Sequence, residues 1–349
     1  MTRALTIGST TITDDSDAYA IAEIGHNHGG DVETCKRLIE AAADAGFSAV
    51  KLQKRNNRDL FTKSAYAQPY SSEHAYGATY GEHREALEFW TDQYIELQSY
   101  AAALNLDFFS TAFDNQSADF LAELDVPAIK MASGDITNTP LLDYVASLQI
   151  PMVVSTGTAN MSDVERAVAT ISRHHTDFTL LQCTATYPCP SYLINLRVIE
   201  TYRQAFPEIV VGLSTHFNGI LMAPLAYALG ARVIEQHVTL DRTAKGSDHA
   251  MSLEPAGQRK LIRDLHRARL ALGSGEKRFL SAEAGAITKM GKSIVAAHDM
   301  SEGHQLEPND FAFKTPGGHI PPWRYPDLLG MVLRRDVKAD EPIAYDMVA

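Results

Sequence analysis

The sequence predicts an α/β protein in which a (β/α)8 barrel is followed by a small β-rich domain. Eight short, β-branched runs alternate with longer amphipathic stretches along most of the 349-residue chain. Eight such units is the number that closes a barrel. The runs are nearly continuous in apolar residues, as expected of parallel strands that are buried on both faces. After about residue 290 the alternation gives way to short β-type pieces.

The expected strands lie at residues 19–25, 49–53, 107–111, 128–133, 152–156, 179–184, 209–214 and 232–238. The first helix is expected to be capped by Asp31 and to end at Gly46. Similar helical patterns occur in SADFLAELD, SDVERAVATISRHH and AGQRKLIRDLHRARLALG, the last of which ends at Gly273. The segment LTIGSTTIT, before the first strand, predicts a hairpin that plugs the amino-terminal end of the barrel.

These patterns divide the chain into three parts. Residues 1–275 are expected to form the barrel with its hairpin, residues 276–291 a linker, and residues 292–349 the small domain. Within the barrel, one connection runs from Lys54 to about Glu82 and is rich in Tyr, Asn and Arg. Connections of this length are usually functional or disordered. We expect either a lid or pocket wall, or a contact between subunits.

Composition and charge restrict the partners. The net charge of -12 argues against nucleic acid and against an anionic membrane surface, although a few local lysines can still bind a small anion. No apolar run is long enough to span a bilayer, and the amino terminus lacks the apolar core of a signal peptide. The three cysteines form no disulfide framework, and Cys183 and Cys189 alone are weak evidence for a metal site. A cytoplasmic location is therefore expected.

Polar residues recur where the expected strands end, which is where barrel active sites form. Lys51 and Lys130 interrupt apolar strands, and a buried lysine is costly unless it meets an anion or an acid. With the hydroxyls of Ser133 and Ser155 they predict a cradle for phosphate and carboxylate groups. The alternative is a structural Lys–Glu pair inside the barrel, for example with Glu23.

Two histidines end adjacent expected strands. The imidazoles of His216 and His237, with a carboxylate such as Glu23, would leave open positions on a divalent ion for substrate and water. From spacing alone this signal is modest, because the chain has 13 histidines and most such residues are structural. The loop after the last strand carries Asp248 and His249, which either reach a substrate hydroxyl or metal or are simply solvated.

The chain resembles the sialic acid synthase family over about residues 17 to 346. The resemblance rests on the ordered stretches IAEIGHNHGG, AVKLQK, TYGEHREALEF, FFSTAFD, IKMASGDITNTPLL, VVSTG, LLQCTATYPCP, GLSTH, IEQHVTLDRTAKGSDHAMSLEP, SIVAAHDMSEG and FKTPGG. It implies a TIM barrel with a carboxyl-terminal SAF (antifreeze-like) domain, usually in a homodimer in which each SAF domain caps the partner's barrel. It also implies condensation of phosphoenolpyruvate with an N-acylamino sugar aldehyde to a nonulosonic acid.

The resemblance also implies roles for single residues. His216 and His237 match the ligands of a divalent ion, for which Mn2+ is expected and Mg2+ or Co2+ are alternatives. Glu23 matches the active-site glutamate. The positions that match phosphoenolpyruvate contacts are Lys51, Thr111, Lys130, Ser133, Ser155 and Ser214. The positions that match sugar contacts are Gln53, Asp135, Tyr187 and Asp248.

Four departures from the family pattern concern the substrates. Ala185 replaces a usual Asn or Ser, Asp135 a usual Glu, and Thr215 a usual Asp. Thr315 stands where the SAF domain commonly has an Arg that contacts the acylamino group, and a guanidinium is not conservatively replaced. The acceptor therefore stays open: a legionaminic- or pseudaminic-type precursor and an unaminated hexose are alternatives. A catalytically inactive, sugar-binding scaffold is the rival from another class.

Overall fold

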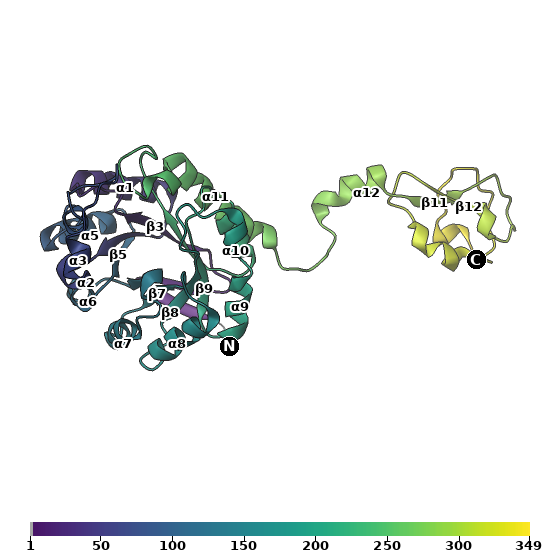
Figure 1. Cartoon of the computed structure of the whole chain (residues 1–349). Helices are drawn as coiled ribbons and strands as arrows, with labels where there is room; N and C mark the ends of the chain where they lie inside the picture. Colours follow the sequence, from purple (N-terminus) through teal and green to yellow (C-terminus); the bar gives the residue numbers. More distant parts are fainter. Residues whose placement is uncertain (1–2) are drawn as a thin grey trace. The chain divides into compact units, whose positions relative to one another are not determined.

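Eight parallel strands close into a barrel in the first part of the chain (Figure 1). The structure is a computed structural model that describes residues 3–349. The barrel strands are β3 (Tyr19–Gly25), β4 (Ala49–Lys54), β5 (Asp107–Ala112), β6 (Ile129–Met131), β7 (Met152–Ser155), β8 (Phe178–Gln182), β9 (Val210–Thr215) and β10 (Val233–His237). Each lies where the sequence predicts a strand, and β10 pairs with β3 to close the ring. The predicted barrel is confirmed.

Helices surround the strands and shield their outer faces from water. They are α1 (Val32–Ala45), α5 (Thr91–Ala103), α6 (Asn115–Glu123), α7 (Thr139–Ser147), α8 (Met161–Ile171), α9 (Val198–Ala205), α10 (Met222–Ala228) and α11 (Pro255–Leu272). The connection after β4 adds the short helices α2 (Asn57–Leu60), α3 (Lys63–Tyr66) and α4 (Tyr80–Glu85). The predicted ends of α1 are confirmed. The Asp31 carboxylate accepts from the backbone N–H of Thr34, and Gly46 ends the helix at a φ of 91°.

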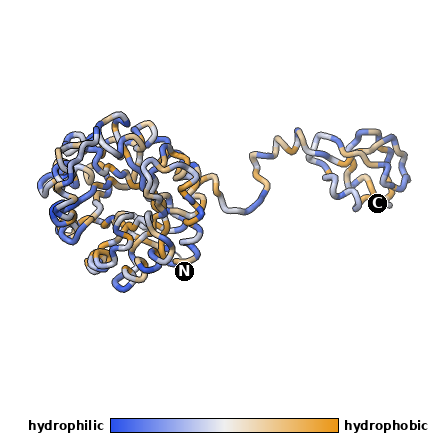
Figure 2. Tube along the Cα trace, in the orientation of Figure 1, coloured by the Kyte–Doolittle hydropathy of each residue, from blue (hydrophilic) through white to orange (hydrophobic). Residues whose placement is uncertain are grey.

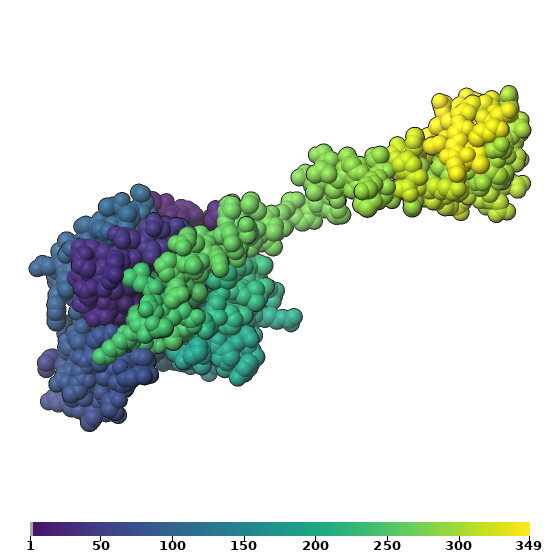
Figure 3. Space-filling view, turned by 90° about the horizontal axis from the view of Figure 1, so that it is seen from above, coloured from purple at the N-terminus to yellow at the C-terminus, as the bar shows by residue number. Residues whose placement is uncertain are grey.

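The strands are buried because both of their faces are covered. Every residue of β3, β7, β8, β9 and β10 is buried. Figure 2 shows hydrophobic stretches inside the ring and hydrophilic ones in much of its periphery. Figure 3 shows α11, in green, beside the purple amino-terminal part of the chain, and α11 packs against α1 and α10. Such burial of apolar surface is the main favourable term in folding.

The predicted hairpin consists of β1 (Ala4–Ile7) and β2 (Thr10–Thr13), which pair antiparallel. Its buried apolar side chains are Leu5, Ile7 and Ile12. A Cβ atom on Gly8, at the turn, would lie 2.4 Å from Oδ1 of Asp107, the first residue of β5. The hairpin therefore covers the amino-terminal end of the barrel, as predicted.

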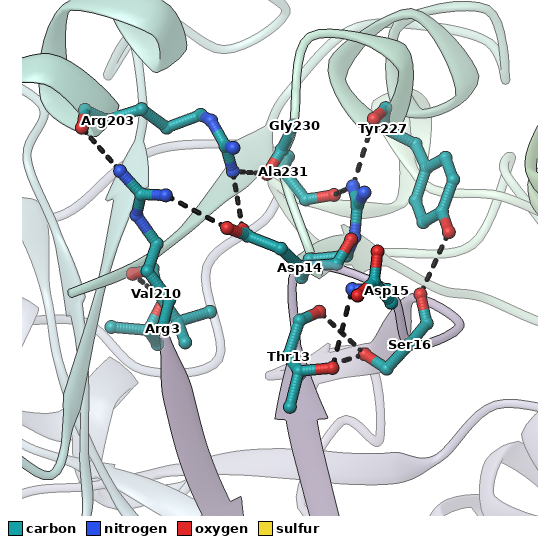
Figure 4. Close-up of polar contacts among 12 residues, drawn as sticks. Arg3, Thr13, Asp14, Asp15, Ser16, Arg203, Val210, Tyr227, Gly230 and Ala231 are labelled. Carbon is teal, nitrogen blue, oxygen red and sulfur yellow. Dashed lines mark hydrogen bonds and ion pairs between the residues drawn. The ribbon is translucent and has the colours of Figure 1, made fainter. Parts of the chain in front are cut away.

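A charged network fastens this hairpin to the barrel (Figure 4). The Asp14 carboxylate accepts hydrogen bonds from Nη1 of Arg3 at 2.9 Å and from Nη1 of Arg203, in α9, at 2.7 Å. Arg203 also donates to the carbonyl of Gly230 at 3.0 Å, and Arg232 donates to the carbonyl of Asp14 at 2.8 Å. These contacts lie at the end of the barrel opposite to the strands' carboxyl ends, so they serve stability.

The chain divides into two compact units, one up to Gly273 and one from Ser274 to Ala349. The second contains α12 (Ala284–Met290) and the antiparallel pair β11 (Ser293–Ala296) and β12 (Phe311–Lys314). Its own apolar core includes Ile294, Leu328 and Ile343. The predicted β-rich character of this part is confirmed. Among residues 3–349, no helix is both long and apolar enough to cross a membrane.

Candidate active site

The predicted site residues belong to all eight strands or to the loops that follow them. Those in strands are Glu23, Lys51, Gln53, Thr111, Lys130, Ser155, Ser214 and His237. Those in the following loops and turns are Ser133, Asp135, Tyr187, His216 and Asp248. Because all eight strands are parallel, their carboxyl ends meet at one mouth of the barrel.

The strand register sets which of these side chains are neighbours. His237 on β10 lies opposite Glu23 on β3, and Glu23 lies opposite Lys51 on β4. Thr111 on β5 lies opposite Lys130 on β6. Residues in register on adjacent parallel strands lie about 5 Å apart across the sheet. The closed ring therefore brings together side chains that are more than 200 positions apart in the sequence.

The ammonium group of Lys51 has three partners. Its Nζ atom lies 2.6 Å from Oε2 of Glu23 and 3.8 Å from Oε2 of Glu235, and it donates to Oγ1 of Thr111 at 2.9 Å. The other oxygen of Glu23 accepts from Nε2 of Gln53 at 2.6 Å. The Lys–Glu pair that the sequence left as an alternative is therefore present.

The second lysine, Lys130, lies in a more neutral setting. Its Nζ atom donates to Oγ of Ser155 and to the carbonyl of Met131, both at 2.7 Å. Burial lowers its pKa. Nearby, Glu235 accepts from Oγ of Ser214 at 2.9 Å. Burial alone would raise the pKa of Glu235, but the two lysine charges outweigh it and lower this pKa to about 2.

These groups make a charge-balanced interior with one carboxyl that takes a proton readily. Burial raises the pKa of Glu23; the Lys51 ammonium opposes this rise and the Glu235 carboxylate adds to it. With Glu23 ionised, Glu23 and Glu235 balance the charges of Lys51 and Lys130, and the raised pKa suits Glu23 to accept a proton.

Two neutral imidazoles face each other at the mouth. The ring centres of His216 and His237 lie 5.4 Å apart. Burial lowers the pKa of His216 to about 4, with the His237 ring contributing, and burial also lowers the pKa of His237. Nδ1 of His216 lies 3.0 Å from the carbonyl oxygen of Thr184, which can only accept. The proton of His216 is therefore on Nδ1, and the lone pair on Nε2 is free.

This pair fits a divalent ion that completes its coordination from elsewhere. Nδ1 of His237 is buried without a hydrogen-bond partner among residues 3–349, and the nearest acid oxygen, Oδ2 of Asp248, lies 3.9 Å away. No cluster of three or more His, Cys, Asp or Glu in the same range has metal-holding geometry. Two neutral imidazoles would thus leave the remaining positions to water and substrate.

Three of the residues matched to sugar contacts lie near these groups. A Cβ atom on Gly25 would lie 3.2 Å from Glu23, 3.3 Å from Gln53 and 3.5 Å from Asp248, so these three side chains converge around one glycine. The ring of Tyr187 packs at 3.9 Å from that of His216 and is 56% exposed. These positions form an outer layer above the lysines.

Two further candidates lie closer to the rim. Asp135 accepts a hydrogen bond from Asn138 at 3.2 Å and contacts none of the other candidates in the described hydrogen-bond network. Oγ of Ser133 accepts from the backbone N–H of Gly157 at 3.0 Å, beside Ala185. The contacts of Asp135 with the sugar and of Ser133 with phosphoenolpyruvate stay predictions.

The long connection after β4 reaches the mouth from outside. It contains the short helices α2, α3 and α4 rather than irregular chain alone. The Tyr76 hydroxyl donates to the carbonyl of Lys245 at 2.7 Å, and Nδ1 of His74 accepts from the N–H of Gly246 at 3.2 Å. Both partners precede Asp248 in the loop after β10. The connection thus forms a wall beside the mouth, which favours the first of its two predicted roles.

Comparison with known proteins decides the family. Residues 38–277 match the NeuB family, and residues 291–349 match the SAF domain. The chain is 40% identical to the N-acetylneuraminate-9-phosphate synthase of Homo sapiens over 95% of this chain and 92% of that protein. It is 36% identical to the N,N'-diacetyllegionaminic acid synthase of Campylobacter jejuni over 93% of this chain and 98% of that protein. The chain belongs to the NeuB family.

A solved structure of the family agrees with the fold. The N-acetylneuraminic acid synthetase of Leptospira borgpetersenii, crystallised with citrate, is 33% identical and superimposes with a TM-score of 0.73. The match covers 82% of this chain and 96% of that one. The resemblance inferred from the sequence is confirmed, and the chain is an enzyme, as predicted. Its β-rich second unit is a SAF domain.

Sequence reasoning missed functional candidates in this NeuB-family chain. Glu235 is not among the predicted site residues, yet its carboxylate lies 3.8 Å from Nζ of Lys51 and accepts from the Ser214 hydroxyl. Arg55 and Arg84 were not singled out, although both contact the ring of His26. The signal for Glu235 was its position two residues before His237, which places both side chains on the same side of a strand.

Proposed function

We propose that this enzyme condenses phosphoenolpyruvate with an N-acylamino sugar aldehyde, forming a nonulosonic acid and releasing phosphate. The observation that carries the proposal is the convergence of Lys51 and Lys130 with His216 and His237 at one barrel mouth. Two ammonium groups suit an enol phosphate, which carries a carboxylate and a phosphate. Two neutral imidazoles suit a divalent ion, for which we propose Mn2+ with Mg2+ or Co2+ as alternatives.

The chain's own residues have distinct tasks in this reaction. Lys51 and Lys130, with Thr111, Ser155 and Ser214, would hold the anion and orient its carbon 3 toward the aldehyde carbon. His216 and His237 would hold the divalent ion, which would supply Lewis acidity when bound.

The carbon–carbon bond then forms from the enol electrons, and carbon 2 becomes positive. Glu23 lies beside Lys51 and is suited to accept the proton of the water that adds to carbon 2. The tetrahedral intermediate then loses its hydroxyl proton and expels phosphate by cleavage of its carbon–oxygen bond, which leaves the keto acid, while the alkoxide formed from the aldehyde takes up the proton released from water.

The second candidate is the same chemistry on a different aldose. The human relative is named for a 9-phosphate product and the Campylobacter relative for a diacetylated one, so acceptors differ within the family. Asp135 and Thr315 are departures at positions that face the acceptor in the family pattern. An inactive scaffold is disfavoured, because nothing in a scaffold requires two buried lysines opposed by two carboxylates at the strand ends.

We further propose a homodimer in which the SAF domain of one subunit covers the barrel of the other. The support is the family pattern and the presence of both units in one chain. Light scattering of the purified protein tests the mass. A variant that ends at Gly273 tests whether turnover needs the second unit.

Phosphate release from phosphoenolpyruvate, measured with a panel of sugar aldehydes, tests the reaction. The panel includes N-acetylmannosamine, its 6-phosphate, a diacetamido hexose and unmodified mannose. Release that requires an aldehyde and a divalent ion supports the proposal. Absence of release with every aldehyde, while the protein is folded and loaded with metal, would leave the scaffold as the better explanation.

A further inference from the structure

Two guanidinium groups beside the barrel mouth have no carboxylate partner among the described residues. Arg55 follows β4, where it is buried, and Arg84 lies in α4, where it is half-buried. The neighbouring acids pair with other cations: Glu23 with Lys51, Glu85 with Arg58, and Glu88 with Lys54. Arginine is seldom buried unless it is paired. Arg55 and Arg84 are neighbouring cations without a carboxylate partner, and this arrangement requires an explanation.

Both guanidinium groups point at the same imidazole. Nη1 of Arg55 lies 2.9 Å from Nε2 of His26, and Nη1 of Arg84 lies 3.2 Å from Nδ1 of the same ring. Burial and the two arginine charges hold the pKa of His26 well below its usual range, so the ring is neutral. A neutral imidazole accepts at only one nitrogen, and guanidinium groups only donate. In one of these two contacts, therefore, an N–H of a guanidinium group faces the N–H of the imidazole, and no hydrogen bond can form there.

The direct side-chain partners of the two guanidinium groups are uncharged. Arg55 packs 3.8 Å above the ring of Phe113 and donates to Oε1 of Gln53 at 2.6 Å. Burial and the charge of Arg84 lower the pKa of Arg55 to about 10; the charges of Glu88 and Glu23 oppose this lowering, but neither carboxylate forms an ion pair with the Arg55 guanidinium. Arg84 donates to the hydroxyl of Tyr80 at 2.8 Å. An anion is the partner that this cluster lacks.

The cluster lies beside two of the residues that are matched to sugar contacts, Gln53 and Asp248. Gln53 joins Arg55 to Glu23 through its two amide atoms. His26 and Arg84 also line a narrow cleft with Asp248. The lysines that suit phosphoenolpyruvate contact different partners, deeper in the barrel. An anion at Arg55 and Arg84 would thus be separate from phosphoenolpyruvate and near the residues matched to sugar contacts.

We propose that Arg55, Arg84 and His26 bind a phosphate group on the sugar acceptor, so that this enzyme prefers a sugar phosphate; the inference rests on the proposed condensation. A phosphate monoester supplies up to two negative charges and three terminal oxygens. It can accept from both guanidinium groups and from the N–H of His26 at once. A carboxylate carries only one negative charge, so it would leave one of the two guanidinium charges uncompensated.

The test compares acceptors that differ only in the anionic group. We expect the kcat/KM for N-acetylmannosamine 6-phosphate to exceed that for N-acetylmannosamine by about 10- to 100-fold, as for charge-assisted hydrogen bonds. A hexuronic acid of the same configuration, which has a carboxylate in place of the phosphate, shows whether any anionic group is enough. Equal efficiency with and without the phosphate overturns this inference and leaves the condensation intact. A preference for the uronic acid overturns the assignment of phosphate.

Variants locate the site. In Arg84→Gln we expect the preference for the phosphorylated acceptor to fall toward one, through a higher KM for that acceptor. Arg84→Lys should restore part of it. Arg58→Gln is the matched control, because Arg58 lies in the same connection and its side chain is 77% exposed. It should leave the preference unchanged.

Two outcomes of the Arg84→Gln measurement contradict the assignment. If the KM for phosphoenolpyruvate rises and the preference is kept, the cluster belongs to the other substrate. If the preference is kept with both KM values unchanged, Arg84 binds neither anion. Circular dichroism of each variant separates these results from loss of folding. Absence of turnover in the wild-type enzyme with every acceptor would instead refute the proposed function itself.

Discussion

Lys51 Nζ lies 2.6 Å from Glu23 Oε2, and both side chains are only 2% exposed. Removal of one partner of such a buried ion pair leaves the other as an uncompensated buried charge, which destabilises the folded state. The pair thus serves both the barrel interior and the proposed chemistry. Substitutions that keep the shape of the side chain are needed to separate these two roles.

Glu23→Gln keeps the shape and removes the carboxylate. We expect kcat for phosphate release to fall by about 10²- to 10⁴-fold, the usual contribution of a general base. The KM for phosphoenolpyruvate should not rise, because the loss of a negative charge beside Lys51 favours an anion. Steady-state kinetics at saturating acceptor measure both values.

The control for this variant is Glu88→Gln. Glu88 is a buried carboxyl that pairs with Lys54 at 3.3 Å, outside the mouth. The Glu88→Gln variant should have a lower melting temperature than the wild type but the same kcat. An unchanged kcat in Glu23→Gln would make Glu23 a packing partner of Lys51 and nothing more.

Lys130→Ala should act mainly on phosphoenolpyruvate binding. The Nζ atom donates to Ser155 and to the carbonyl of Met131, both uncharged, and it feels the charge of Glu235 without a direct ion pair, so it can still donate to an anionic ligand. We expect the KM for phosphoenolpyruvate to rise by about 10- to 100-fold, as for loss of a hydrogen bond to a charged group. Lys130→Met, which preserves volume, should behave alike. Lys260→Met, on the exposed side of α11, is the control. An unaltered KM in a folded variant removes Lys130 from the cradle.

The fold was predictable because its physical signals are local. Strands buried on both faces must be apolar throughout, and the run at 19–25 coincides with β3. Asp31 and Gly46 mark the ends of α1 by their own backbone preferences. Such signals need no knowledge of distant residues.

The pairing of the site could be predicted only in part. The positions of Lys51 and Thr111 at strand ends follow from the pattern, but their contact depends on the register between β4 and β5. The choice between a Lys–Glu pair and an anion cradle was open, since both require a buried lysine. The structure has the pair, and the acidic partner Glu235 could not be assigned without the register between β9 and β10.

The arginine cluster was beyond prediction for a related reason. His26 follows β3, Arg55 follows β4 and Arg84 lies in α4, each about thirty positions from the one before. Each of these residue types is common in solvent-exposed loops, so none of the three positions stands out in the sequence. The three side chains come within hydrogen-bond distance only because β3 pairs with β4 and because α4 lies beside the loops that follow these strands.

His237→Ala should remove both bound metal and turnover. Nδ1 of His237 has no other partner among residues 3–349, and the ring faces His216. We expect Mn2+ binding by calorimetry to be lost and kcat to fall by about 10³-fold or more, as for loss of a Lewis acid worth several kcal/mol. His266→Ala is the control, since His266 is 62% exposed on α11. Turnover that persists after the metal is lost would refute a catalytic role for the ion.

Asp14→Asn should weaken the barrel without touching its mouth. Burial raises the pKa of Asp14, but the hydrogen bonds and charges of Arg203 and Arg3 outweigh this and bring it below its usual 3.8. A lowered pKa stabilises the folded state above the unfolded pKa, and this contribution disappears as the pH falls through the folded pKa. We therefore expect the variant to lose about 1–2 kcal/mol of stability at pH 7, measured by urea unfolding, with kcat unchanged. The difference from the wild type should disappear as the pH falls through the folded pKa of Asp14. A variant as stable as the wild type at pH 7 would mean that the hairpin is held by its apolar side chains alone.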